Sequence, residues 1–127
     1  LYENKVYTYS FYICIVNYRI KKKGDQLHGK NFSQRVKDVL GYSREEAERL
    51  QNSYIGPEHL LLGILRDGSG KAIEALRHLG VQLAELKASV EKDLRLSNDH
   101  INAGDEITIS KSTDKVLKMS ILEARIL

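Results

Sequence analysis

A twelve-residue segment, Tyr54 to Leu65, places the tightest constraint on the fold of this chain. A turn precedes Pro57, which suits the first position of a helix because its fixed φ costs nothing there. Glu58 follows, where a carboxylate complements the positive end of the helix dipole. The apolar run Leu60 to Leu65 comes next. The segment therefore predicts a helix, about Pro57 to Arg66, that is apolar on nearly every side and lies at the centre of the fold.

Three further helices are predicted around this one, because their apolar residues recur at spacings of three and four. They span Ser33 to Leu50, Lys71 to Leu79 and Gln82 to Leu94. Ser33 can cap the start of the first of these, and Gly80 can end the second. Four short helices on tight turns make a compact all-α unit.

The same pattern assigns a face to several side chains. In the helix Ser33 to Leu50, the charged run Arg44 to Arg49 is expected to be exposed. In the helix Lys71 to Leu79, Leu79 is expected to pack inward with other apolar residues. These are Ala72, Ala75 and Leu76.

The sequence repeats itself at a constant offset of 77 residues. When Ile109 to Leu127 is placed over Phe32 to Leu50, seven of the nineteen ungapped positions are identical, more than chance similarity gives. The identical pairs are Ser33 and Ser110, Val39 and Val116, Leu40 and Leu117, Ser43 and Ser120, Glu46 and Glu123, Ala47 and Ala124, and Leu50 and Leu127. The second copy is predicted to be one helix whose apolar residues need a partner, either the first repeat or another molecule.

Composition and the repeat divide the chain into four parts. An atypical N-terminal extension, 1–31, precedes the first repeat, 32–96. The polar stretch 97–108 is predicted to be a linker, and 109–127 the first helix of a truncated second repeat. The fold class that follows is all-α, with one complete four-helix repeat plus the first helix of a second. We expect the chain to be a fragment of a longer protein.

The extension differs from the rest in composition. Its aromatic and β-branched run, Val6 to Ile20, favours a strand over a helix. Asn17 and Arg19 make it too polar to span a membrane, and it lacks the charge order of a signal peptide. We expect a disordered or strand-like segment. Because Leu1 stands where a native chain starts with Met, a non-native leader is one explanation; a nucleic-acid or membrane-surface arm using Lys21 to Lys23 is the other.

Charge and cysteine content exclude several classes of protein. The extension carries a net charge of +4 and the remainder −1, which together give the +3 of the whole chain. A near-neutral body of alternating signs has no clustered basic surface for phosphates, so no nucleic-acid partner is expected for it. The single cysteine, Cys14, cannot form an internal disulfide, which favours a reducing compartment such as the cytoplasm.

Two patterns that suggest chemistry fail when their spacing is checked. The loop Asp67 to Lys71 is like a phosphate loop, but Ala72 and Leu65 stand where that pattern requires a hydroxyl residue and a glycine. The four histidines include no i, i+4 pair, so no metal site is expected, and His59 is predicted to be packed and hydrogen-bonded within the repeat. No catalytic constellation is found, so the chain is predicted not to be an enzyme. The competing hypothesis is nucleotide hydrolysis through Gly68 to Lys71.

Several separated motifs occur in order and together resemble a known family. They are Phe32-Ser33, Val39-Leu40, Glu46-Ala47, Leu50, the whole of Ile55 to Leu65, Gly68, Gly70, Ala72 and Leu76 to Val81. This set resembles the Clp amino-terminal repeat domain, most closely that of ClpC-type AAA+ unfoldases. The resemblance implies two pseudo-repeats of four helices each, mounted flexibly on an ATPase ring.

The resemblance also implies one binding site in this chain. Some ClpC-type domains bind phosphorylated arginine through one acid in each repeat, and Glu58 matches the first of these acids. Ile55, Gly56 and Pro57 form the turn beside it. A carboxylate there can pair with a guanidinium while nearby amides hold the phosphate. The alternative is that Glu58 only complements the helix dipole. Many relatives have Thr in place of Pro57, so a hydroxyl cap is missing here.

For function, the resemblance implies recruitment of proteins rather than chemistry. The expected partners are adaptor proteins, unfolded or marked protein substrates and, through the full-length parent, a peptidase ring; no nucleic acid and no membrane are expected. No cofactor is expected in this chain, because ATP and Mg would belong to the ATPase domains of the parent. The N-domain of a ClpB-type disaggregase is the alternative.

Overall fold

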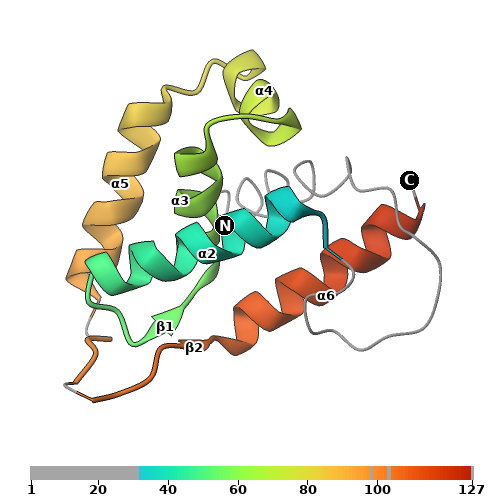
Figure 1. Cartoon of the computed structure of the whole chain (residues 1–127). Coiled ribbons are helices and arrows are strands. Elements are labelled where there is room, and N and C mark those ends of the chain that lie inside the picture. Colours follow the sequence, from blue (N-terminus) through green and yellow to red (C-terminus); the bar gives the residue numbers. More distant parts are fainter. Residues whose placement is uncertain (1–31, 98, 103, 127) are drawn as a thin grey trace.

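The computed structural model describes residues 32–97, 99–102 and 104–126 (Figure 1). The helices are α2 (Gln34–Arg49), α3 (Pro57–Asp67), α4 (Lys71–His78), α5 (Leu83–Leu96) and α6 (Lys111–Ile126), and the strands are β1 (Tyr54–Ile55) and β2 (Thr108–Ile109). Each helix agrees with the predicted one to within two residues at either end, so the all-α prediction is confirmed. The expectations for residues 1–31, including Cys14 and the basic arm, lie outside the described residues.

Helix α2 begins as predicted and crosses α3 at very close range. The Oγ of Ser33 accepts the N–H of Val36 at 3.3 Å and so caps the helix start. At the crossing, a Cβ added to Gly63 of α3 would lie 2.5 Å from the Oγ of Ser43 and 2.6 Å from the carbonyl oxygen of Val39. The two backbones can approach this closely because position 63 has no side chain.

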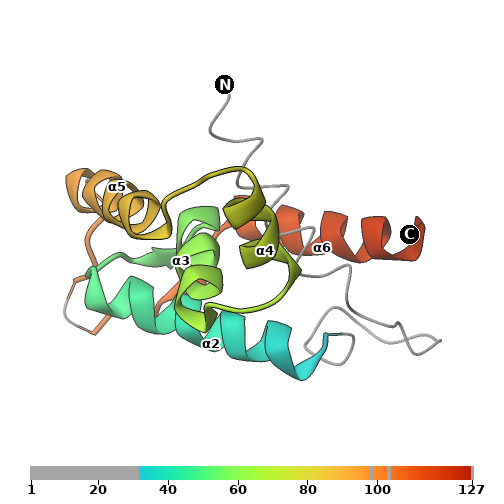
Figure 2. The same ribbon diagram turned by 90° about the horizontal axis from the view of Figure 1, so that it is seen from above.

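Helix α3 is the centre of the fold, as its apolar run predicts. Figure 2 shows it lying over α2, between α5 and α4. One buried cluster joins α3 to α2, α4 and α6, and a second joins α3 to the end of α2 and to α5. Leu117 of α6 belongs to the first cluster and is only 7% exposed. The helix of the second copy therefore finds its partner in the first repeat.

The expectation that Leu79 packs inward is wrong, since its side chain is 75% exposed. Leu79 is the residue at which α4 ends, and Gly80 follows with a φ of +74°. The N–H of Gly80 bonds to the carbonyl of Arg77, and that of Val81 to the carbonyl of Leu76, both at 3.0 Å. This C-terminal turn points Leu79 outward and returns Val81 to the core.

Helix α2 ends with the same two-bond turn as α4, but without a glycine. The N–H of Gln51 bonds to the carbonyl of Glu48 at 3.0 Å, and that of Asn52 to the carbonyl of Ala47 at 2.9 Å. Gln51 has a φ of +58°, a left-handed conformation that an L residue with a side chain adopts at a cost. The turn is nevertheless retained because it satisfies carbonyls at the end of the helix.

The charged run of α2 is not exposed throughout, because Glu46 is buried. Its side chain is 7% exposed and accepts two hydrogen bonds from Arg49, at 2.6 and 3.0 Å. A third bond, at 3.5 Å, comes from Arg66 of α3. Two guanidinium groups thus compensate the loss of water around this carboxylate. The helical period alone predicted that Glu46 is exposed. The ion pairs with Arg49 and Arg66 allow it to be buried instead.

Residues 99–101 of the polar stretch predicted as a linker bond to the first repeat, and the last residue of the stretch, Thr108, begins strand β2. Strands β1 and β2 are parallel, with Tyr54 opposite Thr108 and Ile55 opposite Ile109. Before them, Asn52 and His100 form an isolated antiparallel bridge. Two-residue strands are too short to produce an alternating pattern, which is why the sequence did not predict them.

Candidate binding site

The candidate site is built around the turn that joins β1 to α3. Gly56 is the residue before the helix, and Pro57 is its first residue. The N–H of Gly56 donates to Nδ1 of His59 at 2.9 Å, while the N–H of His59 donates to the carbonyl of Gly56 at 3.1 Å. The His59 ring takes the part of the Glu or Gln side chain in a capping box, while the backbone carbonyl of Gly56 replaces the N-cap side chain that glycine lacks. A side chain thus bonds to the backbone at this helix start, although Pro57 supplies no hydroxyl.

Glu58 lies partly exposed at this helix start, with its carboxylate folded over the turn. A Cβ added to Gly56 would lie 2.6 Å from Oε2 of Glu58 and 3.0 Å from the ring of Tyr54. Position 56 therefore has to be glycine for the carboxylate to occupy this place. Ile55, the fourth residue of the predicted site, is buried, so its contribution to the site is its backbone.

The prediction that His59 is packed and hydrogen-bonded is confirmed. Its side chain is fully buried, and Nε2 lies 2.9 Å from Oδ1 of the fully buried Asn52. Since the N–H of Gly56 occupies Nδ1, the ring proton must be on Nε2, where it is donated to Asn52. Burial lowers the pKa of His59 to about 4, and the negative charge of Glu46 opposes this only in part. The ring is therefore neutral at pH 7.

The N-terminus of α6 lies beside the same turn. The carbonyl of Ile55 accepts the N–H of Ser110 at 3.1 Å and the hydroxyl of Thr113 at 2.7 Å. The Oγ of Ser110 in turn accepts the N–H of Thr113 at 3.1 Å and caps α6. The amides of Lys111 and Ser112 lie in the first turn, where helix amides have no acceptor within the helix.

Ser110 and Thr113 were not predicted as neighbours of the turn, because more than fifty residues separate them from Ile55 in the sequence. One signal was available: Ser110 corresponds to the capping residue Ser33 in the repeat. That signal predicts a helix start but gives no information on where the helix lies.

Chemically, the site combines two complementary features. The Glu58 carboxylate can bind a cation such as a guanidinium. The N-terminus of α6 offers free amides and the positive end of a helix dipole to an anion. The two features lie on either side of the segment 55–58, so this segment offers one partner for a cation and one for an anion.

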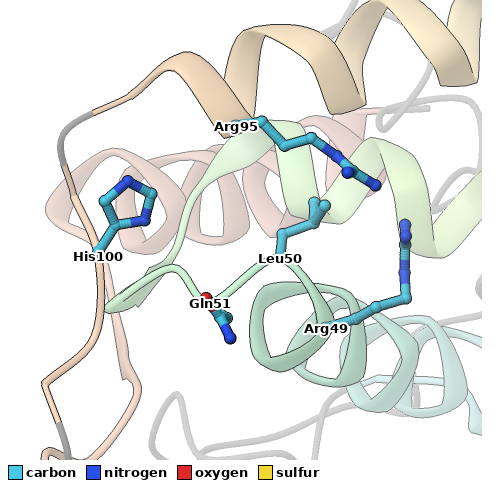
Figure 3. Close-up of a pocket in the computed structure, with 5 residues that line it drawn as sticks. All are labelled: Arg49, Leu50, Gln51, Arg95 and His100. Carbon is cyan, nitrogen blue, oxygen red and sulfur yellow. The ribbon is translucent and has the colours of Figure 1, made fainter.

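A hollow of about 210 Å³ near the ends of α2 and α5 is a different feature (Figure 3). Arg49 and Arg95, from the last turns of these helices, line it together with His100. Arg49 bonds to Glu91 at 2.6 Å, and Arg95 lies 3.9 Å from the same carboxylate. These ion pairs and the negative ends of the two helices account for the arginines, so the hollow is not assigned as a binding site.

Metal sites and membrane spans are two further features that bear on function. Among the residues that the structure describes, no three His, Cys, Asp or Glu side chains form a group suited to a metal ion. Within the same residues, none of the helices has the length and apolar character needed to cross a membrane.

Comparison with known proteins now decides the family. Residues 31–127 match the Clp repeat (R) N-terminal domain. The chain belongs to this family. The resemblance noted in the sequence is thereby confirmed, and the site described above is a feature of a Clp N-terminal domain. No solved structure matches the chain.

The curated relatives are large Clp proteins. The chain is 35% identical over 104 residues to the ATP-dependent Clp protease ATP-binding subunit ClpA homolog of Cyanidium caldarium, covering 79% of the chain and 12% of that protein. It is 38% identical over 94 residues to the chaperone protein ClpB of Oceanobacillus iheyensis, with coverages of 74% and 11%. To the chloroplastic chaperone protein ClpC2 of Oryza sativa subsp. japonica it is 32% identical over 96 residues, with coverages of 76% and 10%. The chain thus spans about a tenth of these relatives.

Proposed function

We propose that this domain recruits adaptors and protein substrates for a ClpC-like ATP-dependent unfoldase, and that its Glu58 site binds phosphorylated arginine side chains. In this proposal the domain performs no catalysis itself. ATP and Mg²⁺ are used by ATPase domains of the full-length parent, which delivers unfolded proteins to a peptidase ring. The process belongs to protein quality control and the stress response, in the cytoplasm.

The observation that carries the proposal is the double hydrogen bond to the Ile55 carbonyl from Ser110 and Thr113. It fixes the positive end of α6 beside the turn that bears Glu58. A phosphorylated arginine has a cationic guanidinium directly bonded to an anionic phosphate, and the site offers a partner for each. A dipole role for Glu58 alone does not require a second helix start at this place.

The alternative is the N-domain of a ClpB-type disaggregase, and the ClpB relative from Oceanobacillus iheyensis supports it. The two functions differ in their ligands. A disaggregase domain should prefer unfolded apolar segments whether or not their arginines are phosphorylated, whereas the proposed site should depend on the phosphate.

The test is calorimetric titration with three peptides of one sequence that carry phosphoarginine, arginine or phosphoserine at the same position. Only the first should bind in the micromolar range. Equal affinity for the phosphoarginine and arginine peptides would favour the disaggregase alternative, and no binding of any of them would overturn the recruitment of marked substrates.

Two matched variants assign the site. Glu58→Gln removes the charge that pairs with the guanidinium and should weaken binding at least tenfold. Glu85→Gln is the control, because Glu85 is likewise an acid in the first turn of a helix, α5. It should bind like the wild type. If both variants bind like the wild type, Glu58 is only a dipole residue.

A further inference from the structure

A fully buried pair, Asn52 and His59, connects the candidate site to a distant part of the chain. On one side, His59 accepts the N–H of Gly56, the residue on which the Glu58 carboxylate rests. On the other side, its Nε2–H is donated to Oδ1 of Asn52 at 2.9 Å. The backbone of the turn is thus held by a side chain that is itself held by a second side chain.

Asn52 is in turn fixed by the end of α5 and by the segment that follows it. Its Nδ2 lies within 3.4 Å of the Leu94 carbonyl and of Oγ of Ser97, and 3.5 Å from the Asp99 carbonyl. The N–H of Ser53 also bonds to the Asp99 carbonyl at 3.1 Å. This segment continues to β2 and α6, so it leads to the second component of the site.

The direction of these bonds depends on one neutral tautomer of His59. A proton on Nδ1 would face the N–H of Gly56, and two donors cannot bond to each other. The charged group that acts on the ring is Glu46 of α2, whose negative charge favours the protonated form. The neighbouring Tyr54 of β1 meets the ring edge-on and donates its hydroxyl to the Asp99 carboxylate at 3.1 Å. Burial outweighs the charge of Glu46, lowers the pKa of His59 and keeps the ring neutral.

We propose that His59, fixed by Asn52, is a positioning residue for ligand binding: it holds the Gly56 amide, and through it the Glu58 carboxylate, in register with the N-terminus of α6. The proposal rests on the proposed function of the Glu58 site and adds that the segment after α5 helps to set its affinity. An apolar side chain could fill the space of His59 but would leave the buried N–H of Gly56 without its acceptor.

The test compares two substitutions of His59 by their affinity for the phosphoarginine peptide at pH 7.5. His59→Gln keeps an acceptor for Gly56 and a donor for Asn52, and Gln is also a natural partner in a capping box. It should bind within about twofold of the wild type. His59→Leu keeps only the bulk and should bind about five- to tenfold more weakly. Equal affinities of the two variants would overturn the proposal.

A control separates positioning from a general loss of stability. Ile73→Ala removes buried apolar volume from α4 and none of the hydrogen bonds of the turn. It should lower the unfolding temperature at least as much as His59→Leu, yet leave the affinity unchanged for the folded protein. A loss of affinity in Ile73→Ala as large as in His59→Leu would mean that only stability matters.

Nitrogen-15 spectra give a readout that needs no ligand. At pH 5.5 the His59 ring should be neutral, with its proton on Nε2, and the Gly56 amide should be shifted and exchange slowly in the wild type and in His59→Gln but not in His59→Leu. If these signatures appear and no peptide binds the wild type, the proposed function fails. The hydrogen bonds from Gly56 to His59 and from His59 to Asn52 are then still supported. A proton on Nδ1 of His59 would overturn both hydrogen bonds and with them the positioning role.

Discussion

Helices α2 and α6 occupy corresponding positions in the two copies of the repeat, and each begins with a serine that caps it, Ser33 or Ser110. Their inner faces are also alike. Ser43 of α2 and Ser120 of α6 correspond in the repeat, are fully or almost fully buried, and donate their hydroxyls to carbonyls of their own helix. The repeat thus preserves the residues that start each helix and those that lie against the fold.

The outer faces of these helices differ. In α2, Tyr42 packs on Arg66, Glu45 pairs with the same guanidinium, and Arg49 bonds to Glu91. The corresponding residues of α6 are apolar and exposed. They are Met119, Leu122 and Ile126. Two helices with the same start and the same inner pattern therefore differ in which side chains find partners. The repeated residues therefore determine where each helix starts and which face is buried. The neighbouring elements determine whether the side chains of the outer face are paired or exposed.

Acid should produce the largest effect, because it protonates His59, which holds the turn between β1 and α3. The pKa of His59 is about 4 in the folded state against 6.5 when exposed. Between these values the unfolded state binds more protons, so stability is complete above pH 6.5 and falls as the pH drops toward 4. The loss should reach about 3 kcal/mol, measured by urea unfolding. In His59→Gln this part of the pH dependence should disappear. If the free energy of unfolding still falls as steeply between pH 6.5 and 4, His59 is not its cause.

Gly63→Ala should have the next largest effect on stability, because it disturbs the close crossing at which α2 packs on α3. The added methyl group would meet Ser43 and the Val39 carbonyl at about 2.5 Å, so the helices must separate. We expect a loss of about 2 kcal/mol in the free energy of unfolding. The control is Gly41→Ala in α2, where nothing lies within 4 Å; it should stabilise by up to about 1 kcal/mol. The same sign for both variants would argue against the crossing.

Thr113→Val tests how α6 is attached. The substitution keeps the shape of this buried side chain but removes the hydroxyl that donates to the Ile55 carbonyl. It should cost about 1 kcal/mol in thermal or urea unfolding. Ser112→Ala changes an exposed neighbour in the same turn and should have almost no effect. A neutral Thr113→Val would mean that the bond from Ser110 suffices.

The smallest effect is expected where α2 ends. Gln51→Gly relieves the left-handed conformation at that position and should stabilise by about 0.5 kcal/mol. Gly80→Gln is the reciprocal change in the matching turn after α4 and should destabilise by about 1 kcal/mol or more. Chemical unfolding of both variants tests the pair, and stabilisation by Gly80→Gln would contradict the explanation.

Part of the candidate site could be predicted from the sequence. Pro57 and Glu58 mark a helix start by local chemistry alone, and the buried, hydrogen-bonded state of His59 follows from its place in an apolar run. No pattern in the sequence indicated its partner Asn52. The neighbouring Ser110 was identified only as part of a repeat, since its contact with Ile55 depends on a strand pair too short to recognise. The role of Glu58 in binding remains a prediction.

By itself, the sequence determined the elements whose causes are local: the apolar period that forms each helix, the serine caps, the proline at the start of α3 and the glycine after α4. Only the tertiary structure decided what depends on distant partners. Arg66 from α3 helps to bury Glu46, the turn after α4 exposes Leu79, and the Ile55 carbonyl holds the start of α6 beside Glu58. The physical reason is that a hydrogen bond or ion pair between distant residues leaves no periodic trace in either segment.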